Sequence, residues 1–325
     1  MVCAYNEEDI IAEKMANTHL LDYPADRLHL VWVTDGSTDN TNTLLSAYPE
    51  VEIVYSPERR GKAAALKHGI KEVKTEIVMM TDANTMLNPG AVREIVRLMQ
   101  DPKVGCVSGE KKVMAKSDSD EAAQGEGLYW KYESTLKRLD GELYSAMGAA
   151  GELCVIRRQL MTDIPDDTLL DDFIISMEIV RTGYKIAYTS KAYAMEYGSA
   201  DLHEESKRKR RIAAGGLQSC WRLRSLMNPL RYPVVAFQFV SHRVLRWTIT
   251  PVCLFALIPL NTILVLSGEG IIYTVIWVLQ ILFYASAAAG LRISKYFVFM
   301  NLNVFRGMAY LFNNTSGMWE KAKRA

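Results

Sequence analysis

Short apolar runs alternate with amphipathic stretches along the N-terminal two-thirds of the chain. The amphipathic stretches repeat their apolar residues at helical spacing, whereas the short runs are bounded by polar and turn-forming residues, which is typical of buried strands. The expected strands cover 2–4, 28–33, 51–55, 77–81, 104–108, 153–156, 184–188 and 192–197. Strands that alternate with helices at this spacing predict βαβ units, and therefore an α/β fold with a mostly parallel sheet flanked by helices.

The C-terminal part of the chain has a different pattern. Residues 226–247 alternate apolar and basic positions, as an amphipathic helix in a membrane interface does. Residues 249–267 and 271–290 are almost uncharged, and each stretch is long enough to span a bilayer as a helix. Residues 297–313 are apolar but include Asn301, Asn303 and Arg306, which favours a re-entrant or interfacial segment over a third span.

The distribution of basic residues predicts how these regions lie relative to the membrane. We expect a cytosolic domain at 1–225, then the interfacial helix, and a membrane region at 248–325. Basic residues flank the two apolar spans on both outer sides, so the positive-inside rule places both flanks and the N-terminal domain in the cytoplasm. A third span would carry the basic tail at 321–324 to the opposite side. The first residues, 1–4, resemble the end of a strand, so we expect a longer N-terminus upstream.

Composition argues against several classes of protein. The formal net charge of +1 gives no charge excess that would favour a nucleic-acid partner. The five cysteines are scattered without a CxxC pair, and the five histidines form no HxxxH or HExxH pattern, which argues against a zinc site or a disulfide framework and fits a reducing compartment. The sequence contains no P-loop and no GxGxxG motif, which disfavours ATPases and dehydrogenases.

Acidic residues stand at the expected C-terminal ends of two strands. Asp35 follows the strand at 28–33, and Asp82 follows the strand at 77–81. Ligands of open α/β sheets bind at this edge, so we expect the two carboxylates to lie near one another. Asn84 lies two residues after Asp82, and oxygen ligands at this spacing suit Mg²⁺ or Mn²⁺ together with substrate phosphates. Taken alone, this pair is equally compatible with a helix N-cap that follows a strand.

Two further charged clusters have more than one interpretation. Asp171 and Asp172 are adjacent at the start of a predicted helix, where capping charge is the simpler explanation. The basic run at 207–211 lies on a predicted long helix at 203–226. Such a run is typical of a solvated face or a membrane-surface patch, and it could also neutralise a diphosphate.

Five short motifs occur in an order that points to one family. They are Ala4-Tyr5-Asn6-Glu7-Glu8, Asp35-Gly36-Ser37-Thr38-Asp39, the segment from Arg60 to Leu66, Asp82-Ala83-Asn84, and Asp171-Asp172. Together with the apolar C-terminal stretches, these motifs resemble the membrane-bound family 2 glycosyltransferases, which are inverting enzymes with a GT-A fold. The chain is most similar to the branch that includes cellulose, hyaluronan, chitin and poly-N-acetylglucosamine synthases. The resemblance covers nearly the whole chain.

The resemblance implies a role for each motif residue. The nucleotide of a UDP-sugar, with UDP-GlcNAc or UDP-glucose as candidates, would bind to Asp35 and lie near Lys62. Asp82 and Asn84 would hold the Mg²⁺ or Mn²⁺ ion that bridges the diphosphate. Asp172 would be the general base. The remaining substrate-binding residues would be Tyr5, Asn6 and Glu7 beside the nucleotide, Asp171, and Arg208 and Arg211 near the diphosphate.

Two departures from the family's pattern bear on the implied activity. Asn84 is neutral where the family has a second aspartate, so the metal site has one negative charge fewer. The family's QxxRW motif aligns with the segment from Arg208 to Ile212, which keeps Arg211 but lacks both the glutamine and the tryptophan. Because the tryptophan supports the acceptor sugar, its absence puts processive polymer synthesis in question.

The implied reaction transfers a sugar from the UDP-sugar to a hydroxyl of a polysaccharide or lipid-linked acceptor at the cytoplasmic face of the membrane. The expected partners are the donor, the acceptor, the lipid bilayer and candidate subunits of a synthase, with no nucleic acid. One alternative is a polyprenyl-phosphate sugar transferase, whose acceptor is already ionised and needs no base. Another alternative is a non-catalytic membrane subunit that keeps the GT-A fold.

Overall fold

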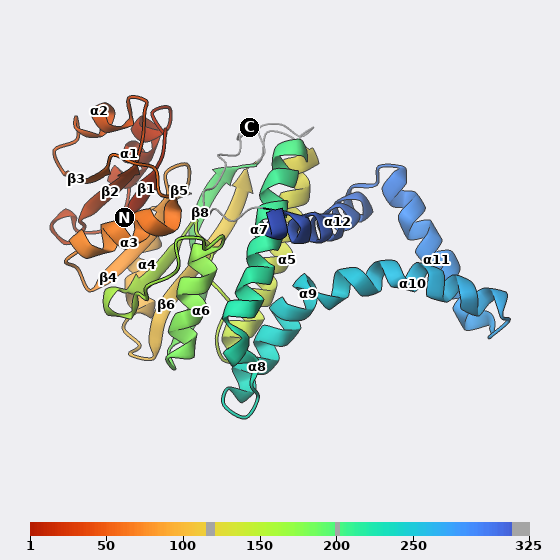
Figure 1. Cartoon of the computed structure of the whole chain (residues 1–325). Coiled ribbons are helices and arrows are strands. Elements are labelled where there is room, and N and C mark those ends of the chain that lie inside the picture. The colour runs from red at the N-terminus through yellow and green to blue at the C-terminus, as the bar shows by residue number, and fades with distance from the viewer. Residues whose placement is uncertain (115–120, 199–201, 314–325) are drawn as a thin grey trace.

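An eight-stranded sheet with helices on both faces forms the body of the molecule (Figure 1). The computed structural model describes residues 1–114, 121–198 and 202–313, so the basic tail at 321–324 lies outside the described residues. The strands are β1 (Val2–Ala4), β2 (Leu30–Asp35), β3 (Val51–Ser56), β4 (Ile77–Asp82), β5 (Met86–Leu87), β6 (Val104–Met114), β7 (Cys154–Arg157) and β8 (Lys185–Tyr197).

Helices account for most of the remaining described residues. The α-helices are α1 (Ile11–His19), α2 (Thr41–Leu45), α3 (Lys62–Glu72), α4 (Ala91–Leu98), α5 (Glu121–Leu143), α6 (Asp171–Arg181), α7 (Leu202–Arg222), α8 (Pro233–Phe239), α9 (Leu245–Trp247), α10 (Ile249–Leu266), α11 (Ile271–Ala288) and α12 (Arg292–Asn313). Shorter helical turns are η1 (Ala25–Arg27), η2 (Arg158–Leu160), η3 (Arg224–Met227) and the π-helical η4 (Val240–Val244).

The sheet is mixed, with the strand order β3-β2-β1-β4-β7-β6-β8-β5. Strands β1, β2, β3 and β4 pair in parallel, as does β6 with β8. Strand β7 runs antiparallel to both β4 and β6, and β5 runs antiparallel to β8. The predicted α/β fold is therefore confirmed, and four of the seven pairings are parallel.

The structure differs from the predicted strands at β8 and β5. One continuous strand, β8, replaces the two predicted at 184–188 and 192–197. The pairing register shifts where Gly109 faces Thr189 and Glu110 faces Tyr193, so the polar residues between the two predicted strands form a bulge rather than a break. Strand β5 was not predicted, because two residues show no periodicity.

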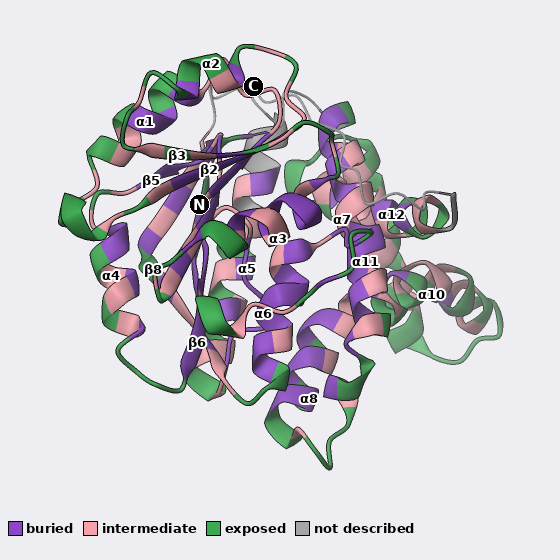
Figure 2. Cartoon of the chain, turned by 60° about the vertical axis from the view of Figure 1, so that its left-hand side comes forward, coloured by how far each residue is buried: buried purple, intermediate pink, exposed green. Residues whose placement is uncertain are grey.

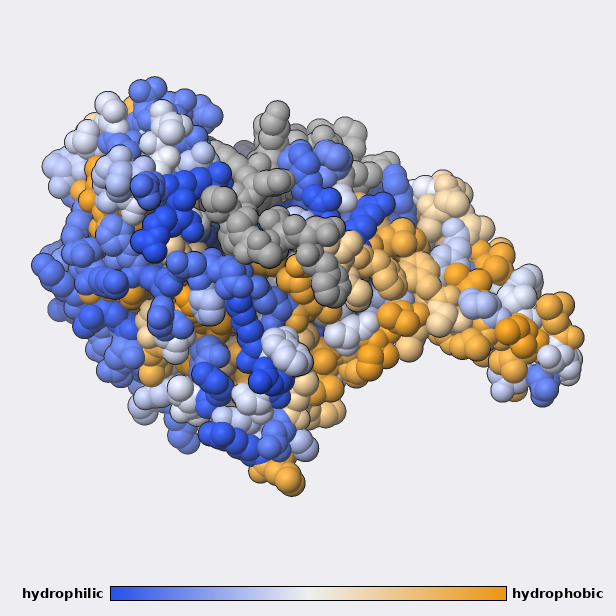
Figure 3. All heavy atoms as spheres, viewed as in Figure 1, coloured by the Kyte–Doolittle hydropathy of each residue, from blue (hydrophilic) through white to orange (hydrophobic). Residues whose placement is uncertain are grey.

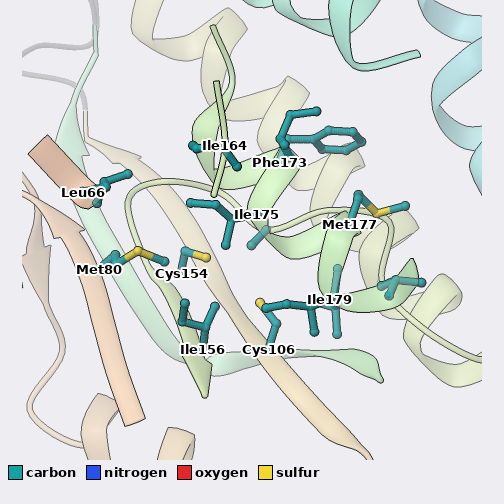
Figure 4. Close-up of a cluster of buried hydrophobic side chains, with 14 of the residues drawn as sticks. Leu66, Met80, Cys106, Cys154, Ile156, Ile164, Phe173, Ile175, Met177 and Ile179 are labelled. Atoms are coloured by element: carbon teal, nitrogen blue, oxygen red, sulfur yellow. The ribbon is translucent and has the colours of Figure 1, made fainter. Parts of the chain in front are cut away.

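Alternate residues of each strand point to opposite faces of the sheet, and each face has its own hydrophobic core. On one face, Met80 and Ile156 pack with residues of α3 and α6 (Figure 4). On the other face, Trp32 packs with α1 and α2, while Val155 packs with α4. Figure 2 shows the buried strands between these helices. Because both faces are covered, the central strands are continuous apolar runs, which explains why the pattern identified them.

The strand order brings the candidate acids to one edge of the sheet. Strand β1 lies between β2 and β4 and is parallel to both, so β2 and β4 end on the same side. Asp35 is the last residue of β2, and Asp82 is the last residue of β4. Helix α3 begins at Lys62 and α6 begins at Asp171, and both starting residues lie at this edge, where Lys62 contacts Asp82 and faces Asp171.

The segment predicted as one interfacial helix consists of several helical pieces. It contains α8, η4 and α9, and the side chains of Val235, Phe239 and Trp247 are buried against the body. Val234 and Phe237 on the other side of these helices are exposed. This segment is therefore amphipathic, with one apolar face packed against the body and another left at the surface.

Helices α10 and α11 project from the body as a hairpin (Figure 1), and their surface is largely apolar (Figure 3). Both are long and apolar enough to cross a membrane, and only 11% and 0% of their residues are buried. Helix α12 then returns along α7, where Ser206 Oγ donates a hydrogen bond to Asn303 Oδ1 at 2.9 Å. The segment expected to be re-entrant or interfacial is thus part of a helix packed on the body.

Candidate active site

The loops after β1 and β2 are joined by hydrogen bonds into one wall of the site. The Thr38 amide donates to Asn6 Oδ1 at 2.8 Å, and the Asn6 amide donates to Ser37 Oγ at 3.1 Å. The Glu7 amide donates to Thr41 Oγ1 at 2.9 Å. Asn6 has a φ of 53°, a left-handed conformation that asparagine adopts more readily than most residues. The first two motifs therefore form one continuous surface.

Asp35 organises the loop that precedes α3. Its two carboxylate oxygens accept hydrogen bonds from the backbone amides of Arg60, at 2.9 Å, and Gly61, at 2.7 Å. The guanidinium carbon of Arg59 lies 3.9 Å from the centre of the Tyr5 ring. Tyr5 and Asp35 therefore both contact the loop that precedes α3. These contacts hold the start of α3, which is Lys62, beside the acids at the edge of the sheet.

Lys62 lies among three aspartates. Its Nζ is 2.6 Å from Asp82 Oδ1 and 3.9 Å from Asp171 Oδ2. A Cβ atom added to Gly151 would lie 3.2 Å from Lys62 Nζ and 3.3 Å from Asp172 Oδ2, so a side chain at this position would crowd both charged groups. The apolar residues that line the pocket include Leu66, Met80, Cys154 and Ile175 (Figure 4). Residues from three separate motifs thus converge in one pocket.

Asp172 holds its proton far more tightly than an ordinary aspartate. Burial and the charge of neighbouring Asp171 raise the pKa of its carboxyl to about 7, although the charge of Lys62 lowers it. The Phe173 amide donates to Asp172 Oδ1 at 2.8 Å and orients the carboxylate. Burial opposes the charge of Lys62, but the three aspartates together raise the pKa of Lys62 well above its ordinary value. The pocket therefore contains a firmly charged lysine and an aspartate that exchanges its proton near neutral pH, as a general base does.

The two arginines predicted near a diphosphate lie in different surroundings. Burial lowers the pKa of Arg211, while the charges of Asp171, Asp82 and Asp172 favour its protonated form. Arg211 therefore lies within electrostatic reach of the pocket's aspartates. Arg208 is only 8% exposed, and its Nη1 lies 2.5 Å from a carboxylate oxygen of Glu126. The charges of the pocket's aspartates thus act on Arg211, whereas Arg208 lies among buried glutamates.

Arg208 belongs to a buried ionic cluster that was not predicted from the sequence. We define the ionic cluster as Lys111, Glu126, Glu152, Glu196 and Arg208. Lys111 contacts Glu196 and lies 2.5 Å from Glu152 Oε1. Although burial raises the pKa of Glu152, Lys111 and Arg208 lower it to about 2. These residues come from β6, α5, β8, α7 and a loop, and no single sequence motif contains them. The charged residues within the strands β6 and β8 are the only feature of the sequence that could have indicated the cluster.

A side chain further along α7 supports the loop that precedes the two adjacent acids. Gln218 Oε1 accepts a hydrogen bond from the Leu169 amide at 3.1 Å, and its Nε2 donates to the Asp167 carbonyl at 2.9 Å. Leu169 lies two residues before Asp171, so Gln218 fixes the chain as it enters α6. Sequence patterns did not assign this role, because it depends on how α7 packs against the loop.

Asp82 and Asn84 are the residues that could hold a divalent cation. Asp82 ends β4, Asn84 follows in the next turn, and both are partly buried. Within the described ranges, no group of three or more His, Cys, Asp or Glu side chains could hold an ion by itself. Mg²⁺ is often held by one or two carboxylates together with substrate phosphates. One carboxylate and one amide oxygen therefore fit a cation that is completed by a bound diphosphate.

Comparisons with known proteins bear on the family and the fold of this chain. Residues 1–215 match the family described as glycosyltransferase like family 2. The chain is 27% identical over 258 residues to the poly-beta-1,6-N-acetyl-D-glucosamine synthase of Staphylococcus aureus (strain MSSA476), covering 76% of this chain and 61% of that protein. The synthase of the same description from Staphylococcus epidermidis is 23% identical over 267 residues, covering 78% and 63%. The chain thus spans less than two-thirds of the length of these relatives.

A solved structure shares the fold. The mannosyltransferase PcManGT from Pyrobaculum calidifontis, in complex with GDP-Man and Mn²⁺, superposes with a TM-score of 0.73 at 22% identity, covering 96% of this chain and 85% of that chain. The predicted GT-A architecture is therefore confirmed, with the C-terminal helices following it. Since the family match also covers most of the chain, the protein belongs to glycosyltransferase family 2.

Proposed function

We propose that this protein is an inverting glycosyltransferase that moves a sugar from a UDP-sugar to a hydroxyl of a polysaccharide or lipid-linked acceptor at the cytoplasmic face of a membrane. The observation that carries the proposal is the pocket in which Lys62 contacts Asp82 and faces Asp171, beside an Asp172 whose pKa is raised to about 7. Membership of family 2 supplies the class of reaction. The similarity to poly-N-acetylglucosamine synthases makes UDP-GlcNAc the first donor to test.

In the proposed reaction, the acceptor oxygen replaces the diphosphate at the anomeric carbon of the donor. Asp172 takes the proton of the acceptor hydroxyl while the new bond between oxygen and carbon forms. The bond from that carbon to the phosphate oxygen breaks on the opposite face, and its electron pair leaves with UDP, which inverts the configuration. Lys62 and Arg211 stabilise the negative charge that builds up on the leaving diphosphate.

The other predicted residues surround the donor. The joined loops that carry Tyr5, Asn6 and Glu7 lie next to Asp35 and would bind the nucleotide. Asp82 and Asn84 would hold Mg²⁺ or Mn²⁺, which when bound supplies electrostatic stabilisation of the diphosphate. Because Asp82 already contacts Lys62, the cation would share this carboxylate with the lysine. The substrate-binding role predicted for Arg208 is less favoured, since its side chain pairs with buried glutamates.

The apolar hairpin supports a membrane location for the reaction. Helices α10 and α11 have the length and hydropathy of membrane spans, and their side chains are largely exposed. Basic residues on both outer sides of the hairpin favour a cytoplasmic position for the domain that carries the pocket. Such a placement would bring the acceptor end of the site near the membrane surface, where a lipid-linked or growing polysaccharide acceptor lies.

The protonation of Asp172 favours a hydroxyl acceptor over a lipid phosphate. A lipid phosphate is already ionised at neutral pH and gains nothing from a base, whereas a hydroxyl must lose its proton as it attacks. A carboxylate with a pKa of about 7 is basic enough to take that proton and is still substantially ionised at neutral pH. This observation ranks the polyprenyl-phosphate transferase below a hydroxyl-directed enzyme.

The proposal is tested by offering the protein, reconstituted in lipid vesicles, a panel of UDP-sugars with Mn²⁺ or Mg²⁺ and measuring the UDP that is released. We expect release from one donor, with UDP-GlcNAc and UDP-glucose tested first, and we expect EDTA to stop it. Release that continues in EDTA would contradict the metal requirement. If no sugar nucleotide gives UDP while the protein still binds a partner synthase, the non-catalytic alternative is correct.

A further inference from the structure

A buried lysine lies behind the turn that carries Asp82 and Asn84. Lys14 on α1 is 2% exposed. Its Nζ donates a hydrogen bond to the Thr85 carbonyl at 2.6 Å and to Thr81 Oγ1 at 3.3 Å. Since Thr81 precedes Asp82 and Thr85 follows Asn84, the ammonium group connects the two ends of this turn.

Packing alone does not explain a charge at this position. Burial lowers the pKa of Lys14 to about 8, and the charge of Asp82 is the one that raises it. An apolar side chain of similar length would fill the same space without the free-energy cost of removing an ammonium group from water. The hydrogen bonds of Lys14 to Thr81 and Thr85, on either side of the two candidate metal ligands, point to a role at the candidate active site.

Other hydrogen bonds tie the same segment to α1 and to itself. Asn17 Nδ2 donates to the Leu87 carbonyl and Asn17 Oδ1 accepts from the Leu87 amide, both at 2.8 Å. Thr85 Oγ1 donates to the Asp82 carbonyl at 2.9 Å. Helix α1 thus fixes the chain from Asp82 to Leu87 through two side chains, and the contact made by Lys14 is the one nearest to the acids.

We propose that Lys14 is a positioning residue for the diphosphate end of the donor site. It holds the backbone of the turn, and so determines where Asp82 and Asn84 present their oxygen atoms. Its charge also adds to that of Lys62 on the other side of Asp82, which favours a polyanionic ligand at this edge. The inference rests on the proposed binding of a UDP-sugar, but it concerns donor affinity and leaves the proton transfer at Asp172 unaffected.

The test compares the affinities of UDP and uridine for the full-length wild-type protein and for Lys14→Met, measured calorimetrically with Mn²⁺ present. Methionine is close to lysine in length and carries no charge, so the variant keeps an unbranched apolar chain at this position but loses both hydrogen bonds to the turn. We expect UDP affinity to fall about tenfold, as for the loss of one hydrogen bond from a charged donor. Uridine lacks the diphosphate, so its affinity should change by less than about twofold.

Lys137→Met is the matched control. Lys137 is also a buried lysine, at 4% exposed, whose Nζ donates to Ser108 Oγ at 3.4 Å, and burial lowers its pKa. It lies on α5 and its hydrogen bond is with β6 rather than with the turn, so its variant should bind UDP as wild type does. Unchanged UDP affinity in Lys14→Met, or an equal loss in both variants or for both ligands, would overturn the inference.

A variant that fails to fold and a protein that does not bind UDP at all are distinguished by further measurements. If Lys14→Met does not fold, Lys14→Gln replaces it, and UDP affinity must again fall while uridine affinity does not. If the wild-type protein binds neither UDP nor any UDP-sugar, the proposed function itself is contradicted, together with the inference that depends on it.

Discussion

The Lys62 pocket and the ionic cluster lie side by side in this molecule, and the pKa values of their acids are shifted in opposite directions. In the pocket, Lys62 faces three aspartates, and the pKa of Asp172 is raised to about 7. In the ionic cluster, Lys111 and Arg208 lower the pKa of Glu152 to about 2. Glu152 directly follows Gly151, whose Cβ position would lie 3.3 Å from Asp172, so the two acids are neighbours.

Local charge balance, rather than burial, accounts for the difference. Burial raises the pKa of both acids. Glu152 lies between two cations, Lys111 and Arg208, which oppose this effect. At Asp172 the charge of Lys62 opposes it, but the charges of Asp171 and Glu152 add to the effect of burial. An acid that nearby cations keep ionised holds structure together, while an acid whose neighbours include other carboxylates is ready to accept a proton. The comparison therefore separates a structural cluster from the pocket that we propose to be catalytic.

The largest effect is expected for Asp172→Asn. Removal of the base should lower the rate of sugar transfer by about 10²–10⁴-fold, because the acceptor hydroxyl then has no group to take its proton. UDP affinity should stay within about twofold of wild type, since the donor contacts remain. Transfer assays and UDP binding on the same preparation provide the measurement.

A matched control for this variant is Asp163→Asn. Asp163 lies in the loop before α6, and its side chain is 91% exposed, so the loss of its charge should leave the rate unchanged. If Asp172→Asn transfers sugar as fast as wild type, the assignment of the base is wrong, and an acceptor that is already ionised, such as a polyprenyl phosphate, becomes the better explanation.

Breaking the ionic cluster should damage folding rather than chemistry. Arg208→Met leaves Glu126 buried without its closest partner, which should destabilise the protein by about 3–5 kcal/mol. Thermal unfolding in detergent measures this effect. Arg138→Met is the control, because Arg138 forms an exposed pair with Glu142 at 2.6 Å, and pairs of this kind contribute less than about 1 kcal/mol. Equal stability of the two variants would contradict a structural role for the cluster.

The cluster also predicts how stability depends on pH. The folded-state pKa of Glu152 is lowered from 4.5 to about 2, so its ionised form stabilises the fold above pH 4.5. This contribution, about 3 kcal/mol at neutral pH, is lost as the pH falls from the unfolded value toward the folded value. Glu152→Gln should therefore be less stable than wild type at neutral pH, with a gap that narrows on acidification. A gap that stays constant with pH would mean that ionisation of Glu152 does not matter.

The strands and the site edge could be predicted because they depend on local pattern. The strand containing Asp82 is buried on both faces and is therefore a continuous apolar run, and the parallel order brings Asp35 to the same edge. The motif order indicated the pocket residues. Lys111 and Lys14 were not predicted, because a buried lysine looks like a surface lysine until its partners from distant elements are known.

Dependence on distant elements also explains why Arg208 and Arg211 lie in different surroundings. Arg208 and Arg211 are three positions apart on α7, and both looked available to a diphosphate in the sequence. In the folded chain Arg208 pairs with Glu126 of α5 and lies near Glu196 of β8, whereas the charges of the pocket's aspartates act on Arg211. Which arginine meets which acid is a property of the tertiary fold.

The central claim is that Asp172 takes the acceptor's proton and that its environment sets the pH at which it can do so. The most direct measurement is the pH dependence of kcat/KM for transfer, which reports the free enzyme. Because the pKa of Asp172 is raised to about 7 by burial and Asp171, the base is protonated and inactive below that pH. We predict that kcat/KM falls about tenfold per pH unit below this value and is level above it. A profile that stays flat down to the ordinary pKa of an aspartate, about 4, would contradict the account.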